Sequence, residues 1–227
     1  MSMQAPSRGG FVTFEGGEGA GKSTHLRRLA ERLTHAGVET VTTREPGGTP
    51  HAEALRDILL SGRAASLGPL AEAALFTAAR IDHVDQLIAP AIKRGAFVLC
   101  DRFADSTRAY QGVVGEVDQR MIALLERAAL GDVRPDLTIV FDLPPEEGLA
   151  RAARRRGEME HPDRFEREGR AFHVKLRQAF LDIAASEPDR CCVVNATRPE
   201  EDVAMAIWKL VEARFLAPTP RETTAKG

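Results

Sequence analysis

A glycine-rich segment that ends in lysine and serine is the part of this chain whose residue types and spacing point most directly to chemistry. It reads Gly16-Gly-Glu-Gly-Ala-Gly-Lys-Ser23 and fits the pattern G-x-x-x-x-G-K-[ST] of phosphate-binding loops. In such a loop the backbone N–H groups surround phosphate oxygens, while the lysine adds a mobile cation and the serine hydroxyl a ligand for Mg²⁺. The segment therefore predicts a site for a nucleoside triphosphate. The residues expected to form it are Gly16, Gly17, Glu18, Gly19, Ala20, Gly21, Lys22, Ser23 and Thr24.

The residues on both sides of this loop are those that the pattern requires. Residues 11–14 are apolar and β-prone, as in a buried strand, and Leu26, Leu29 and Leu33 recur at helical spacing after the loop. Gly37 supplies a stop for this helix. The alternative is a glycine-rich turn that precedes a lysine by chance, and it accounts for neither the strand nor the helix.

The rest of the chain alternates between short apolar runs and longer segments with helical periodicity. Strands are expected over 11–14, 38–43, 96–100, 137–141 and 190–195, and helices over 24–36, 50–60, 69–94, 118–130, 145–156, 163–185 and 199–216. This alternation predicts an α/β fold with a doubly wound parallel sheet of five strands, whose ligands lie at the carboxyl ends of the strands. One domain is expected over 11–216, between a flexible N-terminal segment 1–10 and a flexible tail 217–227.

The composition is that of an ordinary globular protein, with 227 residues, 43% of them hydrophobic, and a formal net charge of −2. Such a balance favours neither nucleic-acid nor membrane binding. The cysteines Cys100, Cys191 and Cys192 lack metal-ligand spacing and are expected to be reduced thiols. Because residues 1–10 lack the apolar core of a signal peptide and no apolar run has transmembrane length, we expect a cytoplasmic protein.

Charged residues follow the expected strands at the edge where ligands should bind. Asp101 comes directly after an apolar strand, which is the position of a carboxylate that holds Mg²⁺, together with Ser23 of the loop. An ion pair between Asp101 and Arg102 is the alternative. Arg102 has a planar fork of donors that can hold oxygens of two phosphates at once.

A second basic group lies further along the chain. Arg151, Arg154, Arg155 and Arg156 share one expected helix, and a segment with glycine and proline follows them. Taken alone, a basic helical face is usually just solvated. In a chain with a phosphate loop, it also fits a lid over about 151–167 that closes over phosphates and keeps water from a phosphoryl group in transfer.

Together these features resemble the thymidylate kinase family, from about Phe11 to Ala196. The segments that carry the resemblance are Glu15-Gly-Gly-Glu-Gly-Ala-Gly-Lys-Ser-Thr24, Thr43-Arg-Glu-Pro-Gly-Gly-Thr49, Leu75-Phe-Thr-Ala-Ala-Arg80, Asp101-Arg-Phe103, Ser106-Thr-Arg-Ala-Tyr-Gln-Gly112 and Arg134-Pro-Asp-Leu137. The phosphate loop alone fits many families, whereas the second, third and fourth segments in combination are specific.

The resemblance implies the three-layer P-loop nucleoside monophosphate kinase fold with a small helical lid. It also implies transfer of the γ-phosphoryl group of ATP to dTMP, giving dTDP, with Mg²⁺. A homodimer that pairs through helices flanking the sheet is implied as well, and the apolar stretches 71–75 and 121–125 are candidate faces for it.

Roles for individual residues follow from the same resemblance. Phe76 corresponds to the aromatic residue that stacks on thymine, Arg80 to the donor to thymine O4, and Thr107 to the residue at the N3 edge. Tyr110 matches the position beneath the sugar, and Glu18 matches an acid near the acceptor sugar and phosphate. The implied catalytic residues are Lys22, Arg102, Arg155, Arg156 and Glu18. The implied dTMP-binding residues are Glu45, Pro46, Arg56, Phe76, Arg80, Arg102, Ser106, Thr107, Tyr110 and Gln111, while residues 16–24 hold ATP.

Two positions depart from the family pattern. Gly19 stands where some members carry an arginine, and in this family that absence accompanies arginines in the lid. Phe103 replaces a frequent tyrosine, so a hydroxyl at this position is not essential.

Two other functions stay open at this point. One is a kinase for another pyrimidine monophosphate, such as dUMP. The other is a nucleotide-dependent switch, although the sequence has no Asn-Lys-x-Asp stretch that would read guanine.

Overall fold

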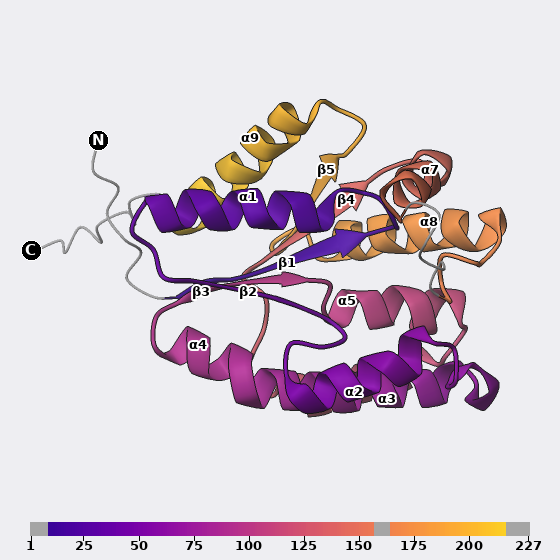
Figure 1. Cartoon of the computed structure of the whole chain (residues 1–227). Helices are drawn as coiled ribbons and strands as arrows, with labels where there is room; N and C mark the ends of the chain where they lie inside the picture. Colours follow the sequence, from indigo (N-terminus) through magenta and orange to yellow (C-terminus); the bar gives the residue numbers. More distant parts are fainter. Residues whose placement is uncertain (1–8, 157–163, 217–227) are drawn as a thin grey trace, which may run out of the picture.

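The computed structural model describes residues 9–156 and 164–216, apart from the side chains of Arg156 and Leu216. Its centre is one parallel sheet of five strands in the order β2-β3-β1-β4-β5 (Figure 1). The strands are β1 (Phe11–Gly16), β2 (Thr40–Arg44), β3 (Phe97–Asp101), β4 (Leu137–Asp142) and β5 (Cys191–Asn195). This arrangement confirms the doubly wound parallel sheet, because β1 lies at its centre with β3 and β2 on one side and β4 and β5 on the other.

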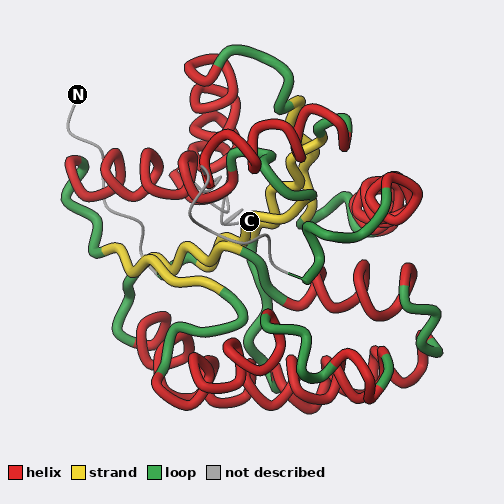
Figure 2. The backbone as a smooth tube through the Cα atoms, turned by 45° about the vertical axis from the view of Figure 1, so that its right-hand side comes forward, coloured by secondary structure: helices red, strands yellow, loops and turns green. Residues whose placement is uncertain are grey.

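Helices cover both faces of this sheet, which gives the expected three layers (Figure 2). They are α1 (Lys22–His35), α2 (Pro50–Leu60), α3 (Pro69–His83), α4 (Ala89–Lys93), α5 (Ala104–Thr107), α6 (Gln119–Leu130), α7 (Pro145–Arg156), α8 (Arg170–Ser186) and α9 (Glu200–Val211). A short 3₁₀ helix covers Ala65–Leu67, and π-helical segments cover Val84–Ile88, Arg108–Val114 and Glu212–Leu216.

The core divides between the two faces of the sheet because successive strand residues point to opposite sides. On one face, Phe14 of β1 and Ile139 of β4 are fully buried beneath α1 and α9. On the other face, Val98 of β3 packs with Phe103 and the helices around α4, while Val140 of β4 packs beneath α8. Since β1, β3 and β4 are covered on both faces, their sequences are mostly apolar, with Thr13, Glu15 and Thr138 as buried polar exceptions.

Besides the helical segment 104–114, for which no helix was expected, three elements differ from the sequence-based expectation. The helix expected over 69–94 is interrupted by the π-helical segment Val84–Ile88, just before Pro90, whose missing N–H would otherwise leave a gap in the helical ladder. The strand expected from 38 begins at Thr40. The helix expected from 163 begins at Arg170, because residues 164–168 form turns and Gly169 precedes the first helical residue; Asp163 itself lies outside the described residues.

The phosphate loop packs directly against the first turn of α7, backbone to backbone. A Cβ built on Gly19 would lie 1.9 Å from the carbonyl oxygen of Gly148, and a Cβ on Gly148 would lie 2.3 Å from the carbonyl oxygen of Glu18. Gly19 also has a φ of +65°, which favours glycine. Position 19 therefore has no room for any side chain, arginine included.

We expect Gly148→Ala to lower the free energy of unfolding by about 1–3 kcal/mol, the usual cost of overpacking. Helix propensity alone predicts the opposite change, because alanine is about 1 kcal/mol more favourable than glycine within a helix. Urea denaturation would measure the change, with Ala150→Gly on an exposed position of the same helix as the matched control for propensity. A Gly148→Ala protein as stable as the parent would show that the loop and α7 do not approach this closely.

Candidate active site

A cavity of about 250 Å³ opens at the carboxyl ends of β1, β2 and β3, the edge at which a doubly wound sheet binds its ligands. All ten residues expected to bind the acceptor nucleotide line it, although they come from four separate stretches of the chain. They are Glu45, Pro46, Arg56, Phe76, Arg80, Arg102, Ser106, Thr107, Tyr110 and Gln111. Residues 18–23 of the phosphate loop close one side of the same cavity.

Lys22 begins α1, and its ammonium group lies within the phosphate loop. Its Nζ donates to the carbonyl oxygens of Gly16 (3.1 Å) and Gly17 (2.7 Å). Burial, reinforced by the positive charge of Arg102, lowers the pKa of Lys22 to about 8. Gly16 and Gly17 therefore hold the lysine in place, and they are not among the residues that line the cavity.

Ser23 and Asp101 lie together, as expected of a magnesium site. The Ser23 hydroxyl donates to the Asp101 carboxylate, although the two residues are 78 positions apart. Within the described ranges, no group of three or more His, Cys, Asp or Glu side chains could hold a metal by itself. One carboxylate and one hydroxyl next to a phosphate loop fit Mg²⁺, which usually takes few protein ligands and completes its shell with phosphates and water.

Arg102 connects the phosphate loop with the acceptor side of the cavity. Its Nη1 donates to the Gly16 carbonyl oxygen (3.0 Å) and to Ser106 Oγ (3.3 Å), and its Nη2 pairs with the Glu18 carboxylate. Burial by itself would lower the pKa of Arg102, but the negative charges of Glu18 and other acids outweigh burial and raise this pKa above its usual value. The ion pair of Arg102 is thus with Glu18, and Asp101 contacts Ser23 instead.

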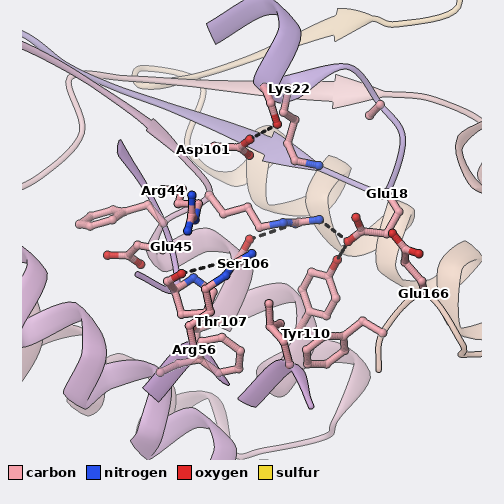
Figure 3. A pocket seen from close by; sticks show the side chains of 18 of the residues that line it. Glu18, Lys22, Arg44, Glu45, Arg56, Asp101, Ser106, Thr107, Tyr110 and Glu166 are labelled. Atoms are coloured by element: carbon pink, nitrogen blue, oxygen red, sulfur yellow. Dashed lines mark hydrogen bonds and ion pairs between the residues drawn. The ribbon is translucent and has the colours of Figure 1, made fainter. Parts of the chain in front are cut away.

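The Glu18 carboxylate lies between Arg102 and Tyr110. The Tyr110 hydroxyl donates to Glu18 Oε1 over 3.0 Å (Figure 3). Burial alone would raise the pKa of Glu18, but Arg102 and Lys22 lower it to about 2. Glu18 is therefore ionised at neutral pH and sets a fixed negative charge beside two fixed positive ones.

Aromatic rings form the walls at the far end of the cavity. The ring of Phe165 packs edge-on against that of Tyr110, with their centroids 5.0 Å apart. Its centroid lies 6.4 Å from that of the Phe76 ring. Phe165 and the neighbouring Glu166 line the cavity but were not anticipated as binding residues, since the lid expected over 151–167 included them without a role.

Arg80 closes the same end, almost completely buried at 3% exposure. Its Nε donates to Glu45 Oε2 (2.7 Å) and its Nη2 to Thr107 Oγ1 (3.1 Å). The other oxygen of Glu45 lies 3.1 Å from His83 Nδ1. Arg80 Nη2 also donates to the Phe103 carbonyl oxygen (3.2 Å). Glu45, Thr107 and Phe103 therefore orient Arg80 where it lines the cavity. Arg56 lies nearby, with its Nη1 donating to the Pro46 carbonyl oxygen (2.6 Å).

A second hollow, of about 360 Å³, lies across the phosphate loop from the first. Thr24 and His25 of α1 line it, with Arg151 of α7 and Arg198, which follows β5. The sequence pointed to Thr24, but it gave no reason to choose His25 or Arg198. The rule that ligands lie beyond strand ends could have drawn attention to Arg198, three residues after β5.

Of the arginines on α7, Arg155 lines both hollows. Arg154 does not line either, and its Nε donates to the carbonyl oxygen of Ala150 on the same helix. The side chain of Arg156, and residues 157–163 of the expected lid, lie outside the described residues.

Comparisons with known proteins agree with this geometry. The family model described as thymidylate kinase matches residues 14–207. A thymidylate kinase of Bradyrhizobium diazoefficiens is 54% identical over 96% of this chain and 95% of its own length, and one of Rhodopseudomonas palustris is 56% identical over 93% and 92%. The crystal structure of thymidylate kinase from Ehrlichia chaffeensis superposes with a TM-score of 0.72, at 32% identity, over 90% of this chain and 99% of that chain.

Among the described helices, none combines the length and apolar character needed to cross a membrane. The fold, the two hollows that share the phosphate loop, and relatives more than half identical over nearly the whole length lead to one conclusion. This chain belongs to the thymidylate kinase family.

Proposed function

We propose that this chain transfers the γ-phosphoryl group of ATP to dTMP, giving dTDP and ADP. The observation that carries this proposal is the position of Arg102, whose guanidinium touches Gly16 of the triphosphate loop and Ser106 and Glu18 beside the acceptor cavity. A protein that only bound or hydrolysed a triphosphate would not need an acceptor cavity on the other side of that arginine.

The two hollows give each nucleotide a place. The triphosphate of ATP lies in the loop 16–24, and its nucleoside lies in the second hollow, next to Arg151 and Arg198. The acceptor lies in the first cavity, with its base against the ring of Phe76 and its phosphate toward Arg102. The two phosphate groups then meet between Lys22, Arg102 and Arg155, which is the arrangement that in-line transfer requires.

The chemistry needs no general base, because the acceptor phosphate oxygen is already anionic. The protein instead has to offset the repulsion between two polyanions. Two unit charges of like sign about 4 Å apart repel by about 4 kcal/mol at an effective dielectric constant near 20. Lys22 and Arg102 provide fixed positive charge at the meeting point, and the exposed Arg155 adds a third positive charge beside the cavity. Electrostatics and positioning therefore carry the catalysis. When bound next to Ser23 and Asp101, Mg²⁺ supplies further charge neutralisation.

Buried donors at the far end of the cavity select the base. Arg80 is held by Glu45, so its free N–H groups face a base carbonyl at a fixed place. The amino group of cytosine at that place would leave both partners without an acceptor, which is costly in a buried site. The methyl group of thymine gives a smaller preference over uracil, since one methyl group in an apolar pocket changes rates by about 10–200-fold.

A homodimer is part of the same proposal. Exposed apolar side chains gather on two helices that pack against each other, Leu70 and Ile81 on α3 and Met121 and Leu124 on α6. Within the stretch 71–75, Ala73 is fully buried, so the face that α3 offers to a partner lies around Leu70 and Ile81 rather than along the whole stretch.

The test of the activity is ADP release, coupled to an indicator reaction, with dTMP, dUMP, dCMP and AMP side by side. We expect the highest kcat/KM with dTMP, a loss of about 10–200-fold with dUMP, and a loss on the order of 10⁴ with dCMP. Steady ATP hydrolysis that is independent of any monophosphate would favour the switch, and faster turnover of dUMP than of dTMP would favour the other pyrimidine kinase.

The pKa of Lys22 makes a separate prediction about ATP binding. Burial lowers this pKa to about 8 in the free protein, and bound phosphates favour the charged lysine and raise it. ATP binding should therefore take up about half a proton from this group at pH 8, and the affinity for ATP should fall as the pH rises above 8. Calorimetry in buffers with different ionisation enthalpies measures this uptake. In Lys22→Arg the guanidinium stays charged, so the uptake should vanish; an equal uptake in that variant would contradict the assignment.

A further inference from the structure

Glu15 is a fully buried carboxylate at the end of β1, with no exposed surface and no part in the proposed chemistry. Its hydrogen-bond partners, Phe103 and Ser106, belong to one short turn that follows the neighbouring strand β3. Oε1 accepts from the backbone N–H groups of Phe103 (2.7 Å) and Ser106 (3.3 Å), and Oε2 accepts from Ser106 Oγ (2.6 Å). A carboxylate on one strand thus holds the start of α5, which follows another strand about 90 residues later in the chain.

That turn contains an uncommon backbone conformation. Arg102 has a φ of +68°, although it is not a glycine. Residues in this region are strained by about 1–3 kcal/mol and stay there only when their surroundings fix them. The Arg102 N–H donates to the Phe14 carbonyl oxygen (3.0 Å), and the next N–H, that of Phe103, donates to Glu15. The last residues of β1 therefore hold both peptide groups that flank the strained position.

The contact with Ser106 extends this effect to the arginine side chain. Ser106 Oγ donates to Glu15 and accepts from Arg102 Nη1 (3.3 Å). Carboxylate, hydroxyl and guanidinium form one chain of hydrogen bonds, in which the carboxylate decides which way the hydroxyl proton points. The hydroxyl oxygen is thereby left free to accept from the arginine.

We propose that Glu15 is a positioning residue for phosphoryl transfer, because its buried carboxylate fixes the Arg102–Ser106 turn and, through Ser106, aims the Arg102 guanidinium at the meeting point of the two phosphates. The inference rests on the proposed function, which gives Arg102 its role. Glu15 itself touches neither nucleotide, since the turn separates it from the cavity that Arg102 and Ser106 line.

Burial and the negative charge of nearby Asp105 raise the pKa of Glu15 to about 7, whereas the hydrogen bonds from Ser106 and Phe103 and the charge of Arg102 favour its ionised form. The hydrogen-bond geometry fits an ionised carboxylate better than any other side chain. All three groups that face Glu15 are donors, and a carboxylate is a pure acceptor. Glutamine has nearly the same shape, but its amide nitrogen would point a donor either at two backbone N–H groups or at the Ser106 hydroxyl. Glu15→Gln therefore removes the alignment while keeping the volume.

The test is a double-mutant cycle between Glu15→Gln and Arg102→Ala, read by kcat, by KM for each nucleotide and by thermal stability. In the parent background we expect Glu15→Gln to lower kcat by about 10²-fold, the usual effect of a small misplacement, with both KM values changed by less than about 3-fold. In the Arg102→Ala background the same substitution should lower kcat by less than about 3-fold, because both residues act through one guanidinium.

The matched control is Thr13→Val, two residues earlier on the same face of β1. Thr13 is also fully buried, and its hydroxyl pairs with that of Thr138 at 2.8 Å rather than with Glu15, Arg102 or Ser106. Thr138 in turn donates to Asp105 over 3.5 Å, so the control reaches the turn only through a second residue. This variant should lose thermal stability with kcat within about 3-fold of the parent, which separates loss of a buried hydrogen bond from loss of alignment. Should Glu15→Gln fail to fold, Ser106→Ala takes its place in the cycle, because Ser106 is only partly buried and interrupts the same chain of hydrogen bonds.

Equal losses of kcat in both backgrounds, or an unchanged kcat in the parent background, would overturn the inference about Glu15 and leave the proposed function intact. Near-parental turnover of Arg102→Ala alone would overturn the role of Arg102, and the inference with it.

Discussion

Two highly charged anions have to meet at bonding distance in this protein, and their mutual repulsion is the constraint on which the rest of the structure depends. The positive charges that offset it cannot be mobile, because a flexible cation would be solvated by water instead of aligned with the reacting oxygens. We propose that the chain meets this constraint by burying Lys22 and Arg102 against carbonyl and carboxylate oxygens, so that both charges are fixed before any nucleotide binds.

The topology of the sheet brings those fixed charges together. Because β1 and β3 are parallel neighbours, the phosphate loop and the Arg102–Ser106 turn leave the sheet at the same edge. Two carboxylates then join the two loops. Glu15, just before the phosphate loop, accepts from the backbone of the turn, and Glu18, within the loop, pairs with the Arg102 side chain. Each loop supports the conformation of the other, which explains why a strained backbone at Arg102 is tolerated at this place.

Much of this site could be predicted from sequence, because its strongest signals are local. The glycine loop, the apolar strands and the charged residues after them mark the binding edge without any knowledge of the tertiary structure. The segment 104–114 was not anticipated as helical, since its helix is set by packing against α6 and α8 rather than by apolar periodicity. The contacts of Phe165 and Glu15 join residues far apart in the chain, and Arg198 shares its hollow with residues of the phosphate loop and α7. No spacing rule reaches across such distances.

The central claim, that Arg102 offsets repulsion between donor and acceptor, is tested most directly by binding without chemistry. The affinity for a non-hydrolysable ATP analogue would be measured by calorimetry with and without saturating dTMP, in the parent and in Arg102→Ala. We predict that dTMP does not weaken binding of the analogue to the parent, but weakens it by about 10-fold or more in the variant, where about 1.4 kcal/mol of the repulsion is no longer offset. The same effect of dTMP in both proteins would contradict the account.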